Sequence, residues 1–219
     1  CQITTSQGRS AAGWRSAVPE ADADAEPTRS VDAWLAGLAA AVAGLFYLGG
    51  GFVWDDGPLI AERLARLDVS GIVGLWTGPV TESGPGAAYY RPVAMTALSV
   101  LGRLGPVPIH LLALALHATS AYLLVRLCAG LRVPILAGLI FAVHPLVGEV
   151  LGWSSALPDA LAVCFGLFAV RVAARWPGLG FLALLLGLWS KENAVLVAVL
   201  VALGVGVDRR TWWPLFAAV

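Results

Sequence analysis

Long apolar runs separated by short polar breaks dominate this chain from residue 32 onward. They lie at residues 32–53, 106–127, 133–147, 157–174, 178–190, 193–207 and 212–219. A helix of about 20 apolar residues crosses a bilayer core about 30 Å thick, because each residue adds about 1.5 Å. The pattern therefore predicts an all-α, polytopic transmembrane helical bundle over residues 32–219, with six spans and the start of another. Three runs, 133–147, 178–190 and 193–207, are short for complete spans.

Two stretches depart from this pattern. Residues 1–31 are rich in Ser, Ala, Arg, Asp and Glu without periodicity, and they predict a disordered cytoplasmic tail. Residues 54–105 form a predicted outer loop, in which Leu59, Ile60, Leu64 and Leu67 recur at helical spacing. That spacing predicts an amphipathic helix lying at the membrane interface. The apolar segment 93–104 is too short to span, so we interpret it as interfacial or re-entrant.

Composition supports a membrane protein. Apolar residues make up 58% of the 219 residues, charged residues only 13%, and the mean hydropathy is +0.80. Soluble domains are about 45–50% apolar and about 25% charged. The formal net charge is zero, so no overall field favours nucleic acid as a partner. The chain begins at Cys1 rather than Met and stops inside an apolar run, and we expect both ends to be cut from a longer protein.

The basic residues indicate how the spans are oriented. With the tail inside, three inner breaks carry Arg pairs, as the positive-inside rule requires. These pairs are Arg126 with Arg132, Arg171 with Arg175, and Arg209 with Arg210. The same topology places eight other polar residues together on the outer face. They are Asp55, Asp56, Arg91, His144, Glu149, Asp159, Lys191 and Glu192.

Asp55 and Asp56 follow the first span directly. Two adjacent carboxylates at a surface of low dielectric favour a raised pKa for one of them, which suits a general base. The alternative is structural: either residue can cap a helix that begins at Gly57-Pro58. Both readings stay open from the residues alone.

Lys191 and Glu192 interrupt about 30 otherwise apolar residues, where ionisable groups are expensive unless they face a cavity or a partner. We predict that Lys191 binds the phosphate of a lipid-linked substrate, and that Arg91, after Tyr90, provides a second, bidentate contact. The alternatives are an interfacial turn with a snorkelling Lys191 and an anchoring role for Arg91.

Three histidines and a polar loop add further candidates. His144, Glu149 and Asp159 stand in a loop between two apolar runs, and we assign them, with Tyr90 and Glu192, either to substrate binding or to structure. His110 and His117 are seven residues apart on one helix face, and we expect them to hydrogen-bond to neighbouring helices. The spacing of Cys, His and acidic residues predicts neither a disulfide framework nor a metal site.

Four short motifs occur in series: Phe52 to Asp56, Tyr90 to Val93, His144 to Glu149, and Ser190 to Glu192. Together they resemble the GT-C glycosyltransferases, especially the transmembrane-and-tetratricopeptide O-mannosyltransferase-like proteins. The resemblance covers residues 32–207. A departure is Leu157-Pro158-Asp159, where that family often has Arg before the Asp.

The resemblance implies an inverting enzyme that transfers a sugar from a polyprenyl-phosphate donor to an acceptor hydroxyl on the periplasmic or lumenal face. It implies that Asp55 or Asp56 is the catalytic base and that Lys191 and Arg91 contact the donor phosphate. We expect mannose as the sugar and protein Ser or Thr as the acceptor, although a lipid or glycan acceptor fits equally well. The expected location is a bacterial inner membrane, or the endoplasmic reticulum in a eukaryote, with any divalent metal left open.

Two other classes remain open. Secondary transporters also contain short, interrupted helices with ionisable groups. Here the charges gather at one membrane face, which favours the transferase. The third class is a non-catalytic membrane scaffold that acts through parts of the protein beyond residue 219.

Overall fold

A computed structural model describes residues 25–79, 89–129, 133–197 and 199. Within these residues the chain is mostly helical and contains no strands. The first helix, α1 (Ala25–Gly44), continues as the 3-10 turn η2 (Leu45–Gly49). It therefore begins inside the segment that the sequence assigned to a tail, while residues 1–24 lie outside the described part.

The remaining helices follow in chain order, many of them starting at proline. They are α2 (Val69–Thr77), α3 (Pro92–Gly102), α4 (Pro106–Leu127), α5 (Pro134–Val143), α6 (Val147–Gly152), α7 (Leu157–Ala173) and α8 (Pro177–Leu188), with the short turns η3 (Gly57–Ala61), η4 (Leu64–Arg66) and η5 (Ser154–Ala156). Proline suits the first turn of a helix because its missing N–H has no partner there in any case.

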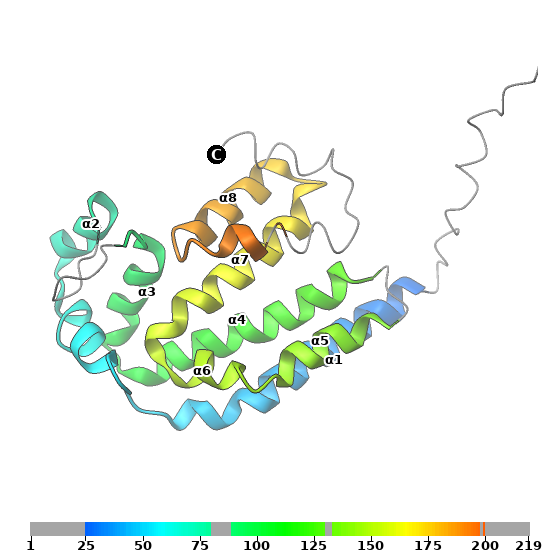
Figure 1. Ribbon diagram of the computed structural model, residues 1–219, viewed down its shortest axis with the longest axis horizontal. Helices are drawn as coiled ribbons and strands as arrows, with labels where there is room; N and C mark the ends of the chain where they lie inside the picture. The colour runs from blue at the N-terminus through cyan, green and yellow to red at the C-terminus, as the bar shows by residue number, and fades with distance from the viewer. Residues whose placement is uncertain (1–24, 80–88, 130–132, 198, 200–219) are drawn as a thin grey trace, which may run out of the picture.

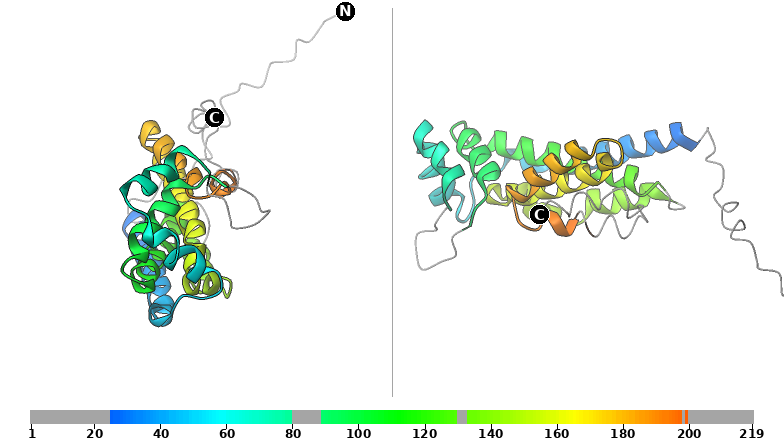
Figure 2. Two further views of the ribbon diagram at one scale, coloured as in Figure 1. Left: turned by 90° about the vertical axis from the view of Figure 1, so that its left-hand side faces the viewer. Right: turned by 90° about the horizontal axis from the view of Figure 1, so that it is seen from above.

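Helix α4 is central in the bundle. It packs against α1, α5 and α7, and α7 in turn packs against α8 (Figure 1). The long helices run along the longest axis of the molecule, and α2 and α3 gather at one end of it (Figures 1 and 2). At that end a core of buried side chains joins the first loop to α3, α4, α6 and α7, and it includes Ile60, Leu98, Ile109 and Leu157.

Three helices are long and apolar enough to cross a membrane: Ser30–Gly49, Pro106–Leu127 and Ser154–Ala173. Two predicted spans are shorter as helices, since α5 has 10 residues and α8 has 12. Helix α5 stops at Val143 because Pro145 disfavours helical backbone at His144, which is extended. For the predicted span 193–207, residues 194–197 and 199 are helical, and the rest, like 212–219, lies outside the described residues.

The single amphipathic helix predicted in the first loop is wrong. The segment forms η3, then η4, then a separate helix α2. Two side chains bind carbonyls that a continuing helix would need: Ser99 Oγ of α3 donates to Leu64 O, and Arg103, directly after α3, donates to Leu67 O. Asp68 then starts α2 as its N-cap, accepting from Gly71 N at 2.8 Å. The four predicted leucine and isoleucine side chains still pack into the core together.

Two histidines of α4 tie it to its neighbours, which confirms the sequence-based expectation. His110 Nδ1 donates to Leu151 O of α6 at 2.7 Å. His117 Nε2 donates to Ala142 O at 3.1 Å, near the carboxyl end of α5. The second bond satisfies a carbonyl left without an intrahelical partner where α5 stops.

Gly138 sets how closely α5 approaches α1 and α4. A Cβ at this position would lie 2.3 Å from Val125 Cγ2, 2.8 Å from Ala36 Cβ and 3.2 Å from Ala121 O. We expect Gly138→Ala to force these helices apart and destabilise the fold by roughly 1–3 kcal/mol. Thermal unfolding of the purified protein in detergent measures this as a lower melting temperature.

The matched control is Gly178→Ala in α8, where an added Cβ meets nothing within 4 Å. It should leave the melting temperature unchanged or raise it slightly, because Ala favours helix over Gly. Equal melting temperatures for both variants would contradict the close packing of α5.

Candidate functional site

Four of the predicted site residues have contacts at or just before the amino end of α7. Asp159 lies in its first turn, and Trp153 and Ser155 lie just before it. Contacts from the first loop and from the turn after α8 reach these residues. Asp55 and Asp56 bind residues just before α7, and Lys191 forms an ion pair with Asp159. Glu192, next to Lys191 in the chain, forms a second ion pair with Arg91.

The two adjacent aspartates have opposite environments. Asp56 is fully buried, and its carboxylate accepts from Val53 N at 3.0 Å, Ser154 N at 3.2 Å, Ser155 N at 2.7 Å and Ser155 Oγ at 2.6 Å. Buried carboxylates are stable only when their oxygens are satisfied in this way. Asp56 therefore fastens the first loop to the start of α7.

Asp55 is exposed. Its Oδ1 accepts from the indole Nε1 of Trp153 at 2.8 Å, which fixes the direction of the carboxylate. Trp54, directly before it, has a φ of 48°, a left-handed conformation that is rare for a bulky residue. This backbone turn separates the two aspartates, so that one faces the interior and the other faces outward. Of the pair, only Asp55 is exposed to solvent.

Lys191 is held by Asp159. Its Nζ lies 2.7 Å from both carboxylate oxygens, and the two side chains are 26% and 33% exposed. Asn193 Nδ2 also donates to Asp159 Oδ1, at 3.3 Å. Asn193 was not among the residues predicted from the sequence, although the polar run from Ser190 onward was a signal for it. This cluster joins α7 to the turn that follows α8.

Arg91 is held by Glu192. The guanidinium Nη2 lies 2.7 Å from Oε1 and 3.0 Å from Oε2, and Nε donates to Oε2 at 3.2 Å. The hydrogen bonds from Arg91 lower the pKa of Glu192 below its usual value. Because that pKa is lowered, the pair's contribution to stability is present above the usual pKa and is lost as pH falls through the lowered one. Arg91 therefore keeps its partner at neutral pH.

Tyr90, His144 and Glu149 occupy other places. Tyr90 donates its hydroxyl to Trp76 O at 2.9 Å and so holds α2. His144 is exposed in the turn after α5, where its Nδ1 accepts from Leu146 N at 3.3 Å. Glu149 is exposed on α6. The side chains of Tyr90 and His144 thus hydrogen-bond outside the ion pairs, although His144 lines the same pocket as Asp159.

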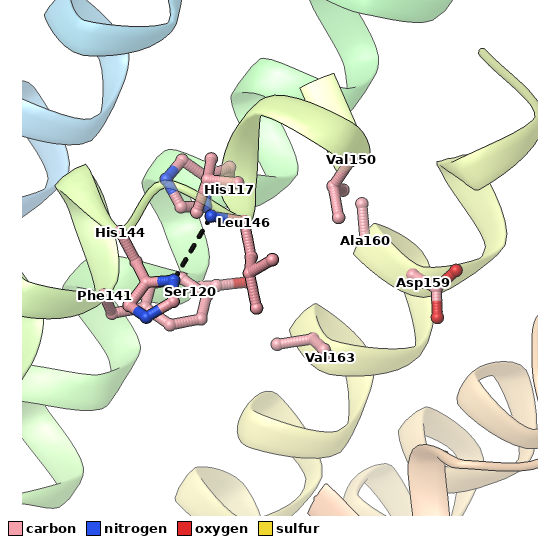
Figure 3. A pocket seen from close by; sticks show the side chains of 10 residues that line it. His117, Ser120, Phe141, His144, Leu146, Val150, Asp159, Ala160 and Val163 are labelled. Carbon is pink, nitrogen blue, oxygen red and sulfur yellow. Dashed lines mark hydrogen bonds between the residues drawn. The ribbon is translucent and has the colours of Figure 1, made fainter. Parts of the chain in front are cut away.

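A pocket of about 210 Å³ lies between α4, the α5–α6 turn and α7. Figure 3 shows His117, Phe141 and Leu146 on one side and Ala160 and Val163 on the other. Its lining is almost entirely apolar. Asp159 stands at its edge, with the carboxylate turned away from the pocket (Figure 3). An apolar chain next to a charged group is the kind of ligand this arrangement suits.

Comparison with known proteins adds no relative: no protein-family model, curated protein or solved structure matches the chain. By its fold, this is a mostly helical protein, and three of its described helices are long and apolar enough to span a membrane. The described residues contain no cluster of three or more His, Cys, Asp or Glu side chains placed to bind a metal ion.

The contrast between Asp55 and Asp56 generates a stability prediction. Asp56→Ala leaves the N–H groups of Ser154 and Ser155 without their acceptor in a buried place, so we expect a loss on the order of 3 kcal/mol. Asp55→Ala removes one exposed hydrogen bond and should change the free energy of unfolding by less than about 1 kcal/mol.

Thermal unfolding of both variants in detergent checks this, and limited proteolysis of the first loop provides a second readout. A melting temperature for Asp56→Ala equal to that of the unsubstituted chain would show that the buried carboxylate does not fasten the loop.

Proposed function

We propose that this protein is an inverting membrane glycosyltransferase that uses a polyprenyl-phosphate-linked sugar as donor. The observation that carries the proposal is the position of Asp55. Its carboxylate is exposed and oriented by Trp153, and it belongs to the same end of the helices as the cations Arg91 and Lys191. An accessible base and fixed cations at the same end of the helices are the groups that transfer from a phosphate leaving group requires.

In the proposed reaction, Asp55 accepts the proton of the acceptor hydroxyl as its oxygen attacks the anomeric carbon. The bond from that carbon to the phosphate oxygen breaks, and the phosphate keeps the electron pair. Arg91 and Lys191 stabilise the negative charge that develops on the phosphate. Asp56 does not contact the reactants and serves to position the loop that carries Asp55.

The membrane setting supports the same proposal. The three candidate spans provide an apolar environment for a prenyl chain. The apolar pocket beside Asp159 offers a place near the ion pairs where such a chain can be shielded from water. We further propose mannose as the sugar, protein Ser or Thr as the acceptor, and the periplasmic or lumenal face as the location of the site.

Substitution of Asp55 tests the base assignment. Asp55→Asn preserves the shape and the hydrogen bond from Trp153, but it cannot accept the proton. We expect sugar transfer to fall roughly 100-fold or more, the usual contribution of a general base, with an unchanged melting temperature. The assay follows a labelled sugar from a prenyl-phosphate donor to an acceptor peptide.

Glu62→Gln, an exposed carboxylate of the same loop, is the matched control and should retain full activity. Turnover of Asp55→Asn equal to that of this control would exclude Asp55 as the base. Complete inactivity of the unsubstituted chain with every prenyl-phosphate sugar tested would count against the transferase as a whole.

A secondary transporter is the second candidate, because α5 and α6 form an interrupted helix beside a pocket. Interrupted helices at binding sites are common in transporters. Uptake of a soluble solute into proteoliposomes without any prenyl-phosphate donor would favour this candidate over the transferase.

A further inference from the structure

The four side chains of the two ion pairs sum to zero formal charge. Arg91 pairs with Glu192, and Lys191 pairs with Asp159, so each cation already has an anionic partner. A donor phosphate approaching this cluster meets no net positive charge. For a phosphate to make close contacts here, one carboxylate has to give up its place.

The two carboxylates differ in how firmly they are held. Asp159 is 33% exposed and is also bound by Asn193, so its loss would leave two donors without a partner. Glu192 is 72% exposed, and the side chain that hydrogen-bonds to its carboxylate is that of Arg91. Of the two carboxylates, Glu192 is therefore the one whose hydrogen bonds water can replace at a low cost in free energy, because exposed ion pairs contribute little to stability.

Arg91 stays in place when Glu192 leaves. Its side chain is only 19% exposed, and its guanidinium lies over the ring of Tyr89, 4.7 Å from the ring centroid. Glu192 occupies the edge formed by Nε and Nη2. A guanidinium edge binds a phosphate with the same fork geometry that it uses for a carboxylate. The edge now covered by Glu192 is thus already shaped for the donor.

We propose that Glu192 is an exchangeable anion, which covers the phosphate-binding edge of Arg91 in the empty protein and is displaced by the phosphate of the donor. This inference rests on the proposed function for the identity of the phosphate. A sugar phosphodiester carries one negative charge, so the exchange leaves the charge of the cluster unchanged. After transfer, the phosphate-bearing carrier leaves, and Glu192 returns to Arg91.

Binding of geranyl phosphate to the full chain in detergent, measured by calorimetry, tests this exchange. Glu192→Gln removes the competing charge at constant shape. We expect it to tighten binding about two- to fivefold, the range that an exposed ion pair supports. Binding of geraniol, which lacks the phosphate, should not change. Arg91→Gln should weaken the binding of geranyl phosphate, and Glu62→Gln should match the unsubstituted chain.

Unchanged or weaker binding of geranyl phosphate by Glu192→Gln would overturn the exchange. If that variant unfolds, Glu192→Asp provides a second test, because its shorter side chain keeps the charge but reaches Arg91 less well, and tighter binding is again expected. Transfer assays separate the two proposals. Tighter phosphate binding by Glu192→Gln without any sugar transfer would support the exchange and reject the transferase. Sugar transfer with unchanged phosphate binding by Glu192→Gln would support the transferase and reject the exchange.

Discussion

The buried carboxylate of Asp56 is the constraint on which the rest of the site depends. It accepts hydrogen bonds from the backbone directly before α7 and from the first loop itself, so it joins two segments that are 98 residues apart. Because Asp56 is turned inward, Asp55 is turned outward beside Trp153. One turn further along α7, Asp159 holds Lys191. The start of α7 therefore fixes an accessible carboxylate and a cation relative to each other.

Covering a charged group costs free energy, and a partner of opposite charge offsets part of that cost. Arg91 and Lys191 are largely covered, and each has a carboxylate partner. Pairing protects the empty protein, but it also limits what an incoming anion gains. Under the proposed exchange, a ligand binds well only if it fits the Arg91 edge better than Glu192 does. The same ion pairs thus connect the stability of the fold to the proposed choice of a phosphate-bearing substrate.

Sequence patterns predicted the helical class and the positions of two long helices, since the runs 106–127 and 157–174 match α4 and α7. They did not predict that α5 ends at Val143, inside the run 133–147. They failed in the first loop, because the side chains that interrupt the predicted amphipathic helix belong to Ser99 of α3 and to Arg103, the residue after α3. The sequence also did not distinguish Asp55 from Asp56, since the distinction depends on the distant Ser154 and Ser155. Local pattern reveals which residues are unusual, whereas their roles follow from partners far away in the chain.

The most direct test of this account is which residues share one side of the membrane. Single cysteines at positions 62, 192 and 175 are introduced into a background in which Cys1, Cys128 and Cys164 are replaced, and oriented vesicles are treated with a membrane-impermeant maleimide. The account predicts that positions 62 and 192 are labelled from the same side and that position 175, at the opposite end of α7, is labelled only from the other. Labelling of positions 62 and 192 from opposite sides would contradict it.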